Sequence, residues 1–357
     1  MKSKVYLIRT SNSDTVDTIK KSFARLIEKV TPFAFIQRGN SIVLKLHFGE
    51  EGNTGYVNPL YVRLVADAVH SQEGVPFLFD TNTLYRGKRT NSKDHVQLAY
   101  KHGFTQVATG AEIVIPDDTR EGVTAEISVN GKFVKTAKIA RFFSDADGLI
   151  GIAHFKGHIM TGFGGALKNL GMGCATREGK LFQHAGVAPF VKAKKCVGCG
   201  ACEKVCPVKA ITINSGKAAV DKLICIGCAS CIAVCPYEAI DIRWEAGSGT
   251  LQQKMIEYAK AALMSKKGRA IFINFALKIT KECDCLAQDD PRVAPDVGVF
   301  LSEDPVSIDK ACFDEICKVC GKDIFKELHP ERNGMIQLKH AAAIGLGSLD
   351  YECVEIT

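Results

Sequence analysis

Residues 195–207 read KCVGCGACEKVCP, and residues 224–236 read ICIGCASCIAVCP. Each stretch contains the same spacing, C-x2-C-x2-C-x3-C-P. Three cysteines two residues apart can wrap three corners of a cubane cluster in one tight loop, and the small residues between them let backbone N–H groups turn toward the sulfurs. The spacing therefore predicts two [4Fe–4S] clusters and a fold built around them.

The fourth cysteine of each run lies too far along the chain to complete its own cluster, so we assign it to the other one. One predicted set is Cys196, Cys199, Cys202 and Cys235, and the other is Cys225, Cys228, Cys231 and Cys206. The alternatives are a zinc site or a disulfide framework. Zinc favours paired C-x2-C couples, and disulfides do not explain the repeat.

The composition is that of an ordinary globular chain with a substantial core. It has 357 residues, of which 46% are hydrophobic and 24% charged, which is enough for two or three structural units. The N-terminal MKSKVYLIRT lacks the apolar core of a signal peptide, and no apolar run reaches the length of a membrane span. Together with fifteen cysteines, these features lead us to expect a reducing compartment, the cytoplasm of an anaerobic or microaerobic microbe, and no membrane contact.

The net charge gives little support to a nucleic-acid partner. The formal value is +7. Eight cluster thiolates would add about −8 and two cluster cores about +4, which leaves about +3. The basic run at residues 85–89 (YRGKR) is the remaining support for nucleic-acid binding.

Outside the cysteine runs, predicted strands alternate with predicted helices. Strands are expected at 5–9, 41–47, 75–80, 111–115, 146–153, 270–275 and 297–301, and helices at 14–30, 58–70, 91–102, 251–264 and 305–317. Asn130-Gly131 predicts a hairpin within 126–139. This order favours an α/β domain with a mainly parallel sheet and flanking helices.

The order of elements also predicts an insertion. We expect the first part of the α/β domain over residues 1–186, a two-cluster ferredoxin-like α+β domain over 187–243, and the second part of the α/β domain over 244–357. Polar residues follow the predicted strands: Lys45, His47, Glu50, Asp80, Asn82 and Arg86. In open α/β sheets the ligand crevice lies at the carboxyl ends of the strands, where these residues fall.

The stretch 154–184 reads HFKGHIMTGFGGALKNLGMGCATREGKLFQH and is the richest in chemically active side chains outside the cysteine runs. Its glycines let backbone approach a ligand. His154 and His158 could share a helix face, although Gly157 between them weakens that expectation. The alternative is that the stretch forms a glycine-rich turn whose cationic side chains are exposed to solvent. We favour a site because its side chains suit an anionic substrate (Lys168, Lys180), a ligand or nucleophile (Cys174) and the binding of substrate or metal (His158, His184).

A third metal or cluster site is predicted near Cys283 and Cys285, whose sulfurs could reach one metal. Cys312, Cys317 and Cys320 follow and could contribute to it. For Cys312 the alternative is a buried small hydrophobic residue.

Two long motifs resemble the domain-of-unknown-function family numbered 362. They are FKGHIMTGFGGALKNLGMGCATREGK at 155–180, followed by His184 and the cysteine runs, and ECDCLAQDDPRVAPDVGVFLSEDPVSIDKACFDEI at 282–316. The resemblance implies a microbial iron–sulfur protein and supports a site at His158, Lys168, Asn169, Gly171, Cys174, Lys180 and His184, which stand in the family motif. It supplies no substrate.

These observations lead us to expect an iron–sulfur oxidoreductase. Two [4Fe–4S] clusters would carry electrons between a redox partner protein and a substrate or metal site in the α/β domain, where a small anionic substrate could bind. The alternative is a non-enzymatic electron carrier, or a metal or cluster assembly protein, with the α/β domain as a docking module.

Overall fold

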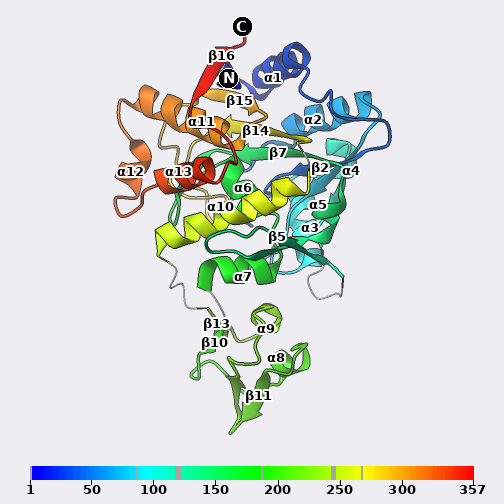
Figure 1. The fold of residues 1–357 in the computed structure, drawn as a ribbon, viewed down its shortest axis with the longest axis vertical. Coiled ribbons are helices and arrows are strands. Elements are labelled where there is room, and N and C mark those ends of the chain that lie inside the picture. The colour runs from blue at the N-terminus through cyan, green and yellow to red at the C-terminus, as the bar shows by residue number, and fades with distance from the viewer. Residues whose placement is uncertain (1, 86, 117–121, 186–187, 243–246, 267) are drawn as a thin grey trace.

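A computed structural model describes residues 2–85, 87–116, 122–185, 188–242, 247–266 and 268–357. An eight-stranded sheet forms the centre of its larger part (Figure 1). In spatial order the strands are β16 (Tyr351–Glu355), β1 (Ser3–Arg9), β15 (Gly298–Ser302), β14 (Ala270–Ala276), β7 (Gly148–His154), β2 (Ser41–Lys45), β3 (Val75–Phe79) and β4 (Glu112–Val114). β15 runs antiparallel to β1 and β14, and the other neighbouring pairs are parallel. The predicted mainly parallel α/β sheet is confirmed.

Helices cover both faces of the sheet, so its central strands are apolar on both sides. Strand β7 is buried along all seven residues. On β14, Phe272 joins the core formed with α6 (Ala166–Gly171), α10 (Ser248–Met264) and α11 (Pro305–Cys320). Its neighbour Ile273 points to the other face, into the core formed with α1 (Val16–Val30) and α2 (Pro59–Ser71). This two-sided burial is typical of parallel sheets.

The remaining elements of the larger part are shorter. The helices are α3 (Ser92–Lys101), α4 (Gln106–Thr109), α5 (Arg141–Asp145), α7 (Arg177–Ala185), α12 (Ile324–Leu328) and α13 (Met335–Ala343). Two antiparallel hairpins are β5 (Thr124–Ser128) with β6 (Thr136–Ala140), and β8 (Lys156–His158) with β9 (Gly162–Gly164). Among the described helices, none has the length and apolar character to cross a membrane.

Local sequence signals account for the ends of the helices. α11 begins where the Asp304 side chain accepts hydrogen bonds from the backbone N–H groups of Val306 and Ser307, with Pro305 in the first turn. It ends at Gly321, whose φ of 67° lies in the left-handed region. α1 is capped by Thr15, whose side-chain oxygen accepts a hydrogen bond from the backbone N–H of Thr18.

Two local expectations need correction. His154 and His158 do not share a helix face, because they lie on strands β7 and β8. The hairpin at Asn130-Gly131 exists, but its strands pair from Thr124↔Ala140 to Ser128↔Thr136, which leaves a longer loop than a two-residue turn. In that loop the N–H of Val129 donates to the carbonyl of Lys135.

Residues 188–242 form a small unit that projects from the larger part, below α7 in Figure 1. It contains β10 (Phe190–Val191) paired with β13 (Ile240–Asp241), β11 (Ile211–Asn214) paired with β12 (Lys217–Val220), and the one-turn helices α8 (Ala201–Lys204) and α9 (Ser230–Val234). The domain boundaries predicted at 186/187 and 243/244 fall on residues outside the described part of the chain, as does Arg86.

Candidate functional site

A cavity of about 440 Å³ lies at the carboxyl ends of the central parallel strands. Its polar lining comes from segments that follow β2, β3, β7 and β14 and from α6 and α7. The charged, imidazole and thiol side chains in this lining are Lys45, His47, Asp80, Arg89, His154, Lys156, His158, Lys168, Lys180, His184, Cys283 and Cys285. The sheet topology thus brings segments far apart in sequence to one edge, as the crevice rule for open α/β sheets anticipates.

A buried ion pair lies at the floor of this cavity. Lys45, whose side chain is 1% exposed, places its Nζ 3.0 Å from Asp80 Oδ1, 2.9 Å from Asn169 Oδ1 and 2.8 Å from the Leu46 carbonyl oxygen. Burial by itself would raise the pKa of Asp80, but the combined electrostatic effects of Lys45, His47, His95 and Lys180 hold that pKa well below its usual range. A Cβ at position 173 would overlap the Lys45 ammonium, so Gly173 is required here.

A second buried group joins β7 to the loop after β14. Asp284 Oδ1 lies 2.8 Å from His154 Nδ1, and its Oδ2 lies 3.1 Å from Lys156 Nζ. Burial opposes the ionised carboxylate, yet His154 and Lys156 together hold the pKa of Asp284 well below its ordinary value. Asp284 therefore carries a negative charge that neutralises Lys156.

Cys283 and Cys285 form a hydrogen-bonded thiol pair beside Lys168. Lys168 Nζ lies 3.2 Å from Cys283 Sγ. The hydrogen bond from Cys285 lowers the pKa of Cys283 well below that of a free thiol. Burial opposes this shift, and the charge of Lys168 favours it. The same hydrogen bond and burial raise the pKa of Cys285. The two opposite shifts favour ionisation of Cys283 over Cys285, and Lys168 lies beside the more acidic thiol.

His158 faces the same thiol pair. One ring nitrogen of His158 and the two sulfurs lie within 4.8 Å of one another. Its Nδ1 lies 3.0 Å from the Thr161 hydroxyl and 3.2 Å from the backbone nitrogens of Met160 and Thr161. Burial, and then the charge of Lys168, lowers the pKa of His158 well below its usual value, so the ring is neutral.

α6 and α7 bring the predicted lysines to the cavity. Lys180 Nζ, from α7, donates to the Thr81 hydroxyl and to the carbonyl oxygens of Thr81 and Asn82. His184, one turn further along α7, also lines the cavity; burial lowers its pKa to about 3.

The N-terminus of α6 is held by a buried carboxylate from α11. Asp309 accepts hydrogen bonds from the N–H groups of Ala166 and Leu167 at 2.7 and 2.9 Å, and from the Asn274 side chain at 2.7 Å. Burial raises the pKa of Asp309 to about 6. Asp309 therefore fixes the helix that carries Lys168 into the cavity.

Several cysteines named from the sequence lie elsewhere. Cys174 does not line the cavity: it is fully buried in the hydrophobic core, and burial raises its pKa to about 12. Cys312 is fully buried on α11, and Cys317 and Cys320 pack against the same core at the end of that helix. In the part of the chain that the structure describes, they join no group of ligands close enough to share one metal ion.

Sequence reasoning missed two contributors. Arg89, read there as part of a basic run, is 2% exposed and pairs with Glu50 at 3.1 Å, so it is not free for phosphate. Its Nη1 lies 2.8 Å from His47 Nε2. His95 is fully buried, with its Nε2 3.8 Å from Asp80 Oδ2. The sequence contained one signal for the Arg89–Glu50 pair: an acidic and a basic residue that each follow the end of a predicted strand.

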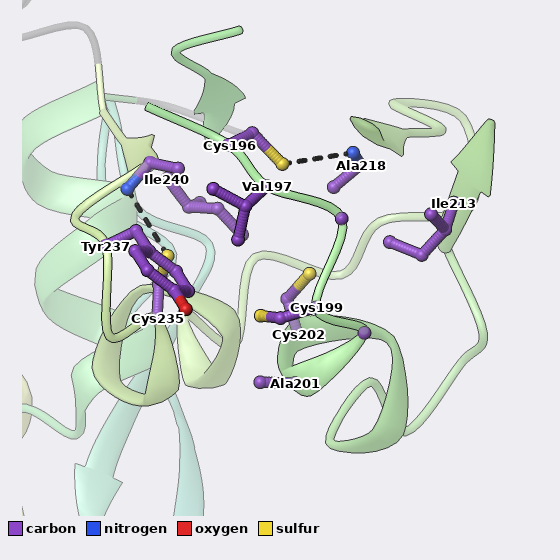
Figure 2. Close-up of a pocket in the computed structure, with 13 residues that line it drawn as sticks. Cys196, Val197, Cys199, Ala201, Cys202, Ile213, Ala218, Cys235, Tyr237 and Ile240 are labelled. Atoms are coloured by element: carbon purple, nitrogen blue, oxygen red, sulfur yellow. Dashed lines mark hydrogen bonds between the residues drawn. The ribbon is translucent and has the colours of Figure 1, made fainter. Parts of the chain in front are cut away.

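The eight cysteines of the small unit line two separate small cavities. One is lined by Cys196, Cys199, Cys202 and Cys235 (Figure 2). The other is lined by Cys206, Cys225, Cys228 and Cys231. Each set contains the first three cysteines of one run and the last cysteine of the other. All fifteen cysteines of the chain have free thiols.

Backbone N–H groups point at several of these sulfurs. Ala218 N lies 3.3 Å from Cys196 Sγ, a contact drawn in Figure 2, and Ala239 N lies 3.3 Å from Cys235 Sγ. In the other set, Ala210 N lies 3.2 Å from Cys206 Sγ. Such donors stabilise negative charge on sulfur.

A small apolar cluster connects the small unit to the large cavity. It consists of Leu84, Leu181, Ala229 and Ile242, all less than 5% exposed. Leu84 lines the large cavity, and Ala229 lines the cavity of the Cys206 set. The Cys206 set is therefore the one joined by direct packing to the large cavity.

Comparisons with known proteins give a family and distant structural likenesses. The model of the family described as "Domain of unknown function (DUF362)" matches residues 42–314. No curated protein matches the chain. A protein of known crystal structure from Thermotoga maritima is similar at 11% identity and a TM-score of 0.43, over 86% of this chain and 59% of that one. The lactate racemase apoprotein from Thermoanaerobacterium thermosaccharolyticum is similar at 12% identity and a TM-score of 0.37, over 76% of this chain and 50% of that one.

The chain thus spans less than two thirds of the length of either solved structure. The family match, in contrast, covers most of the sheet, the cavity lining from β2 onward, both cysteine runs and the Cys283–Cys285 loop. This chain therefore belongs to the DUF362 family.

Proposed function

We propose that the protein is an iron–sulfur oxidoreductase. The eight cysteines of residues 188–242 would hold two [4Fe–4S] clusters, through which electrons from a redox partner protein reach a small substrate in the cavity of the α/β domain. The observation that carries the proposal is the interleaved grouping of the thiols, in which each small cavity receives three cysteines from one run and the fourth from the other.

The arrangement of the thiols fits cubane clusters better than single ions or disulfides. Ligands of one metal ion lie close together, and no three thiols among the described residues of the small unit lie within 4.8 Å of one another. The four cysteine sulfurs that bind the irons of a cubane cluster lie further apart than the ligands of one ion. Free thiols and N–H groups aimed at Cys196, Cys206 and Cys235 suit sulfurs that carry negative charge.

When bound, the clusters supply reversible one-electron storage. The packing contacts give the route a direction. Exposed apolar side chains line both small cavities: Val197 and Tyr237, 56% and 47% exposed, in the Cys196 set, and Ile226, 48% exposed, in the Cys206 set. Because the Cys206 set is the one that packs toward the large cavity, we assign the encounter with the partner protein to the Cys196 set. The Cys206 set, which touches Leu84 through Ala229, would face the substrate.

The large cavity would bind an anionic substrate. Its lining contains the cationic side chains Lys45, Arg89, Lys156, Lys168 and Lys180, and among the described residues of that lining one carboxylate, Asp80. The imidazoles of His158 and His184 are neutral because they are buried among cations. Two one-electron oxidations of the partner protein would balance one two-electron reduction of the substrate.

Oxygen-free purification with iron and sulfide analysis and EPR of the reduced protein tests the proposal. We expect about eight iron and eight sulfide per chain. Cys206→Ser and Cys225→Ser should perturb the same EPR signal, and Cys235→Ser and Cys199→Ser the other. The exposed Cys353→Ser serves as the matched control and should change neither. Absence of iron and sulfide, or a Cys206→Ser effect that groups with Cys199→Ser, would overturn the proposal.

The second candidate is an electron carrier whose α/β domain only docks onto a partner. Lys168→Met and His184→Gln separate the two functions, since both side chains line the large cavity and neither belongs to the cysteine sets. An oxidoreductase should lose thermal stabilisation by small carboxylates in these variants while electron transfer to artificial dyes persists. Unchanged carboxylate binding together with unchanged transfer to dyes would favour the carrier.

A further inference from the structure

The loop after β14 and the β8–β9 hairpin bring three soft or borderline ligands to one wall of the large cavity. Cys283 and His158 are 2% and 9% exposed, and Cys285 is half-buried. All three line the cavity that also contains Lys168. Among the described residues, this is the group of His, Cys, Asp and Glu side chains whose ligand atoms fall within 4.8 Å of one another.

We propose that His158, Cys283 and Cys285 bind one divalent transition-metal ion of the zinc or iron class, with a fourth position open to the cavity for a small anionic ligand. The inference deepens the proposed function, because this ion would receive the substrate at the far end of the electron route. It stands on its own geometry, however, and can be tested whether or not clusters are present.

The donor set suits such an ion. Two thiolates and one imidazole with an open position form the arrangement of a catalytic rather than a structural zinc site. A tetrahedral ion with Zn–S bonds of about 2.3 Å holds its two sulfurs about 3.8 Å apart, close to the separation of hydrogen-bonded thiols. A small closure of side chains that already lie within 4.8 Å therefore completes the site.

The backbone of the thiol loop is held from two sides, which keeps the ligands in place without an ion. The Asp284 carbonyl accepts a hydrogen bond from the Glu50 N–H at 2.9 Å. The Cys285 carbonyl accepts from the Tyr85 hydroxyl at 3.2 Å and from Arg89 at 3.3 Å. Arg89, absent from the site predicted from the sequence, is thus a positioning residue for Cys285.

The outer contacts of His158 allow two tautomers. In one, the Thr161 hydroxyl donates to the Phe163 carbonyl oxygen at 2.7 Å, and its own oxygen accepts from Nδ1–H of His158, which leaves an Nε2 lone pair for the metal. In the competing tautomer, Nδ1 accepts from the N–H groups of Met160 and Thr161, and Nε2–H is a donor to the thiols. The experiment below distinguishes the two.

Charge balance indicates the class of the fourth ligand. Binding of a divalent ion displaces the proton in the Cys283–Cys285 hydrogen bond, and the ion then neutralises the two resulting thiolates. Asp284 neutralises Lys156 at 3.1 Å. The Lys168 ammonium, 3.2 Å from Cys283, then leaves the site with one net positive charge. A carboxylate or another small anion would balance that charge at the open position.

Zinc-edge X-ray absorption on the full chain tests the inference, because the iron of any clusters does not contribute at that edge. After addition of one equivalent of Zn²⁺ we expect two sulfur neighbours at about 2.3 Å and one imidazole nitrogen at about 2.0 Å. Cys285→Ser should remove one sulfur, and His158→Gln should remove the imidazole signal and keep both sulfurs. The matched control Cys353→Ser should leave the spectrum unchanged.

Bromide serves as the probe anion. It should appear as a heavy neighbour of the ion in the wild-type protein, and Lys168→Met should weaken its binding at least tenfold. The cysteines of the small unit can also bind Zn²⁺. The readout is therefore the one equivalent of zinc that the double variant Cys283→Ser/Cys285→Ser loses relative to the wild type. Circular dichroism confirms that the double variant is folded.

The inference is overturned if the double variant retains the full zinc content, if the wild-type spectrum lacks the imidazole nitrogen, or if bromide does not bind. Formation of a Cys283–Cys285 disulfide in place of zinc binding would also overturn it. Iron and sulfide analysis of the same samples reports separately on the two clusters, so failure of the proposed function and failure of this metal site give different results.

Discussion

The buried pair of Lys45 and Asp80 provides a direct test of how the cavity floor is stabilised. Their side chains are 1% and 4% exposed, and Nζ lies 3.0 Å from the carboxylate. Replacing Lys45 by Met removes the cation but leaves Asp80 buried, and leaves Asn169 and the Leu46 carbonyl without this donor. Breaking a buried pair in this way costs about 3–5 kcal/mol, because the remaining charge is not compensated.

The double variant Lys45→Met/Asp80→Asn removes both charges, so we expect it to be about 2 kcal/mol or more stable than the sum of the two single substitutions would give. Urea unfolding followed by far-UV circular dichroism under oxygen-free conditions measures the four free energies of the cycle. The exposed i,i+4 pair Arg63–Asp67, 42% and 49% exposed, is the matched control and should couple by less than about 0.5 kcal/mol. Additive effects at Lys45 and Asp80, or coupling equal to that of the control, would refute the reasoning.

Two further predictions concern the segments that hold the site. Asp309 has a folded-state pKa of about 6 against an ordinary 3.8, so the folded state holds its proton more tightly and its contribution to stability is lost as pH rises from about 4 through 6. Relative to Asp309→Asn, the wild type should therefore lose about 3 kcal/mol over that range in urea unfolding; a constant difference between the two proteins would contradict this. Gly157→Ala places a Cβ against the Lys281 carbonyl oxygen, on the segment that leads into Cys283, and should cost about 1–3 kcal/mol in the free energy of unfolding. Gly247→Ala, where a Cβ meets nothing within 4 Å, is the control, and equal stability losses in the two variants would show that the close approach is not what matters.

The grouping of the cysteines is the feature that the sequence determines most fully. The first three cysteines of each run lie within seven residues, so their arrangement depends on local backbone conformation. Few tight-turn conformations are compatible with this spacing. The spacing predicts the exchange of Cys206 and Cys235 between the two sets, and in the structure each of them lines the small cavity that also contains the first three cysteines of the other run. Whether iron and sulfide occupy these sets stays a prediction.

The sheet was predictable for a related reason. Apolar runs and amphipathic helices can be recognised from local periodicity in the sequence. The predicted bounds of β7 and β14 agree with the structure to within about two residues. The antiparallel direction of β15 and the edge strand β16 were not predictable, because neighbours in the sheet are chosen by the packing of the whole chain.

The tertiary structure decided the composition of the cavity. His158 and Cys283 are separated by more than a hundred residues, and only the adjacency of β7 and β14 brings the segments that follow these strands together. Cys174 stands in the same glycine-rich motif as Lys168, but the short helix α6 turns the chain so that its thiol enters the core. Sequence spacing reports distances along the chain, whereas burial and charge pairing at the cavity depend on which strand ends meet in space. The residue types of the site could therefore be predicted from the sequence, whereas the tertiary structure determines which of these side chains contact one another.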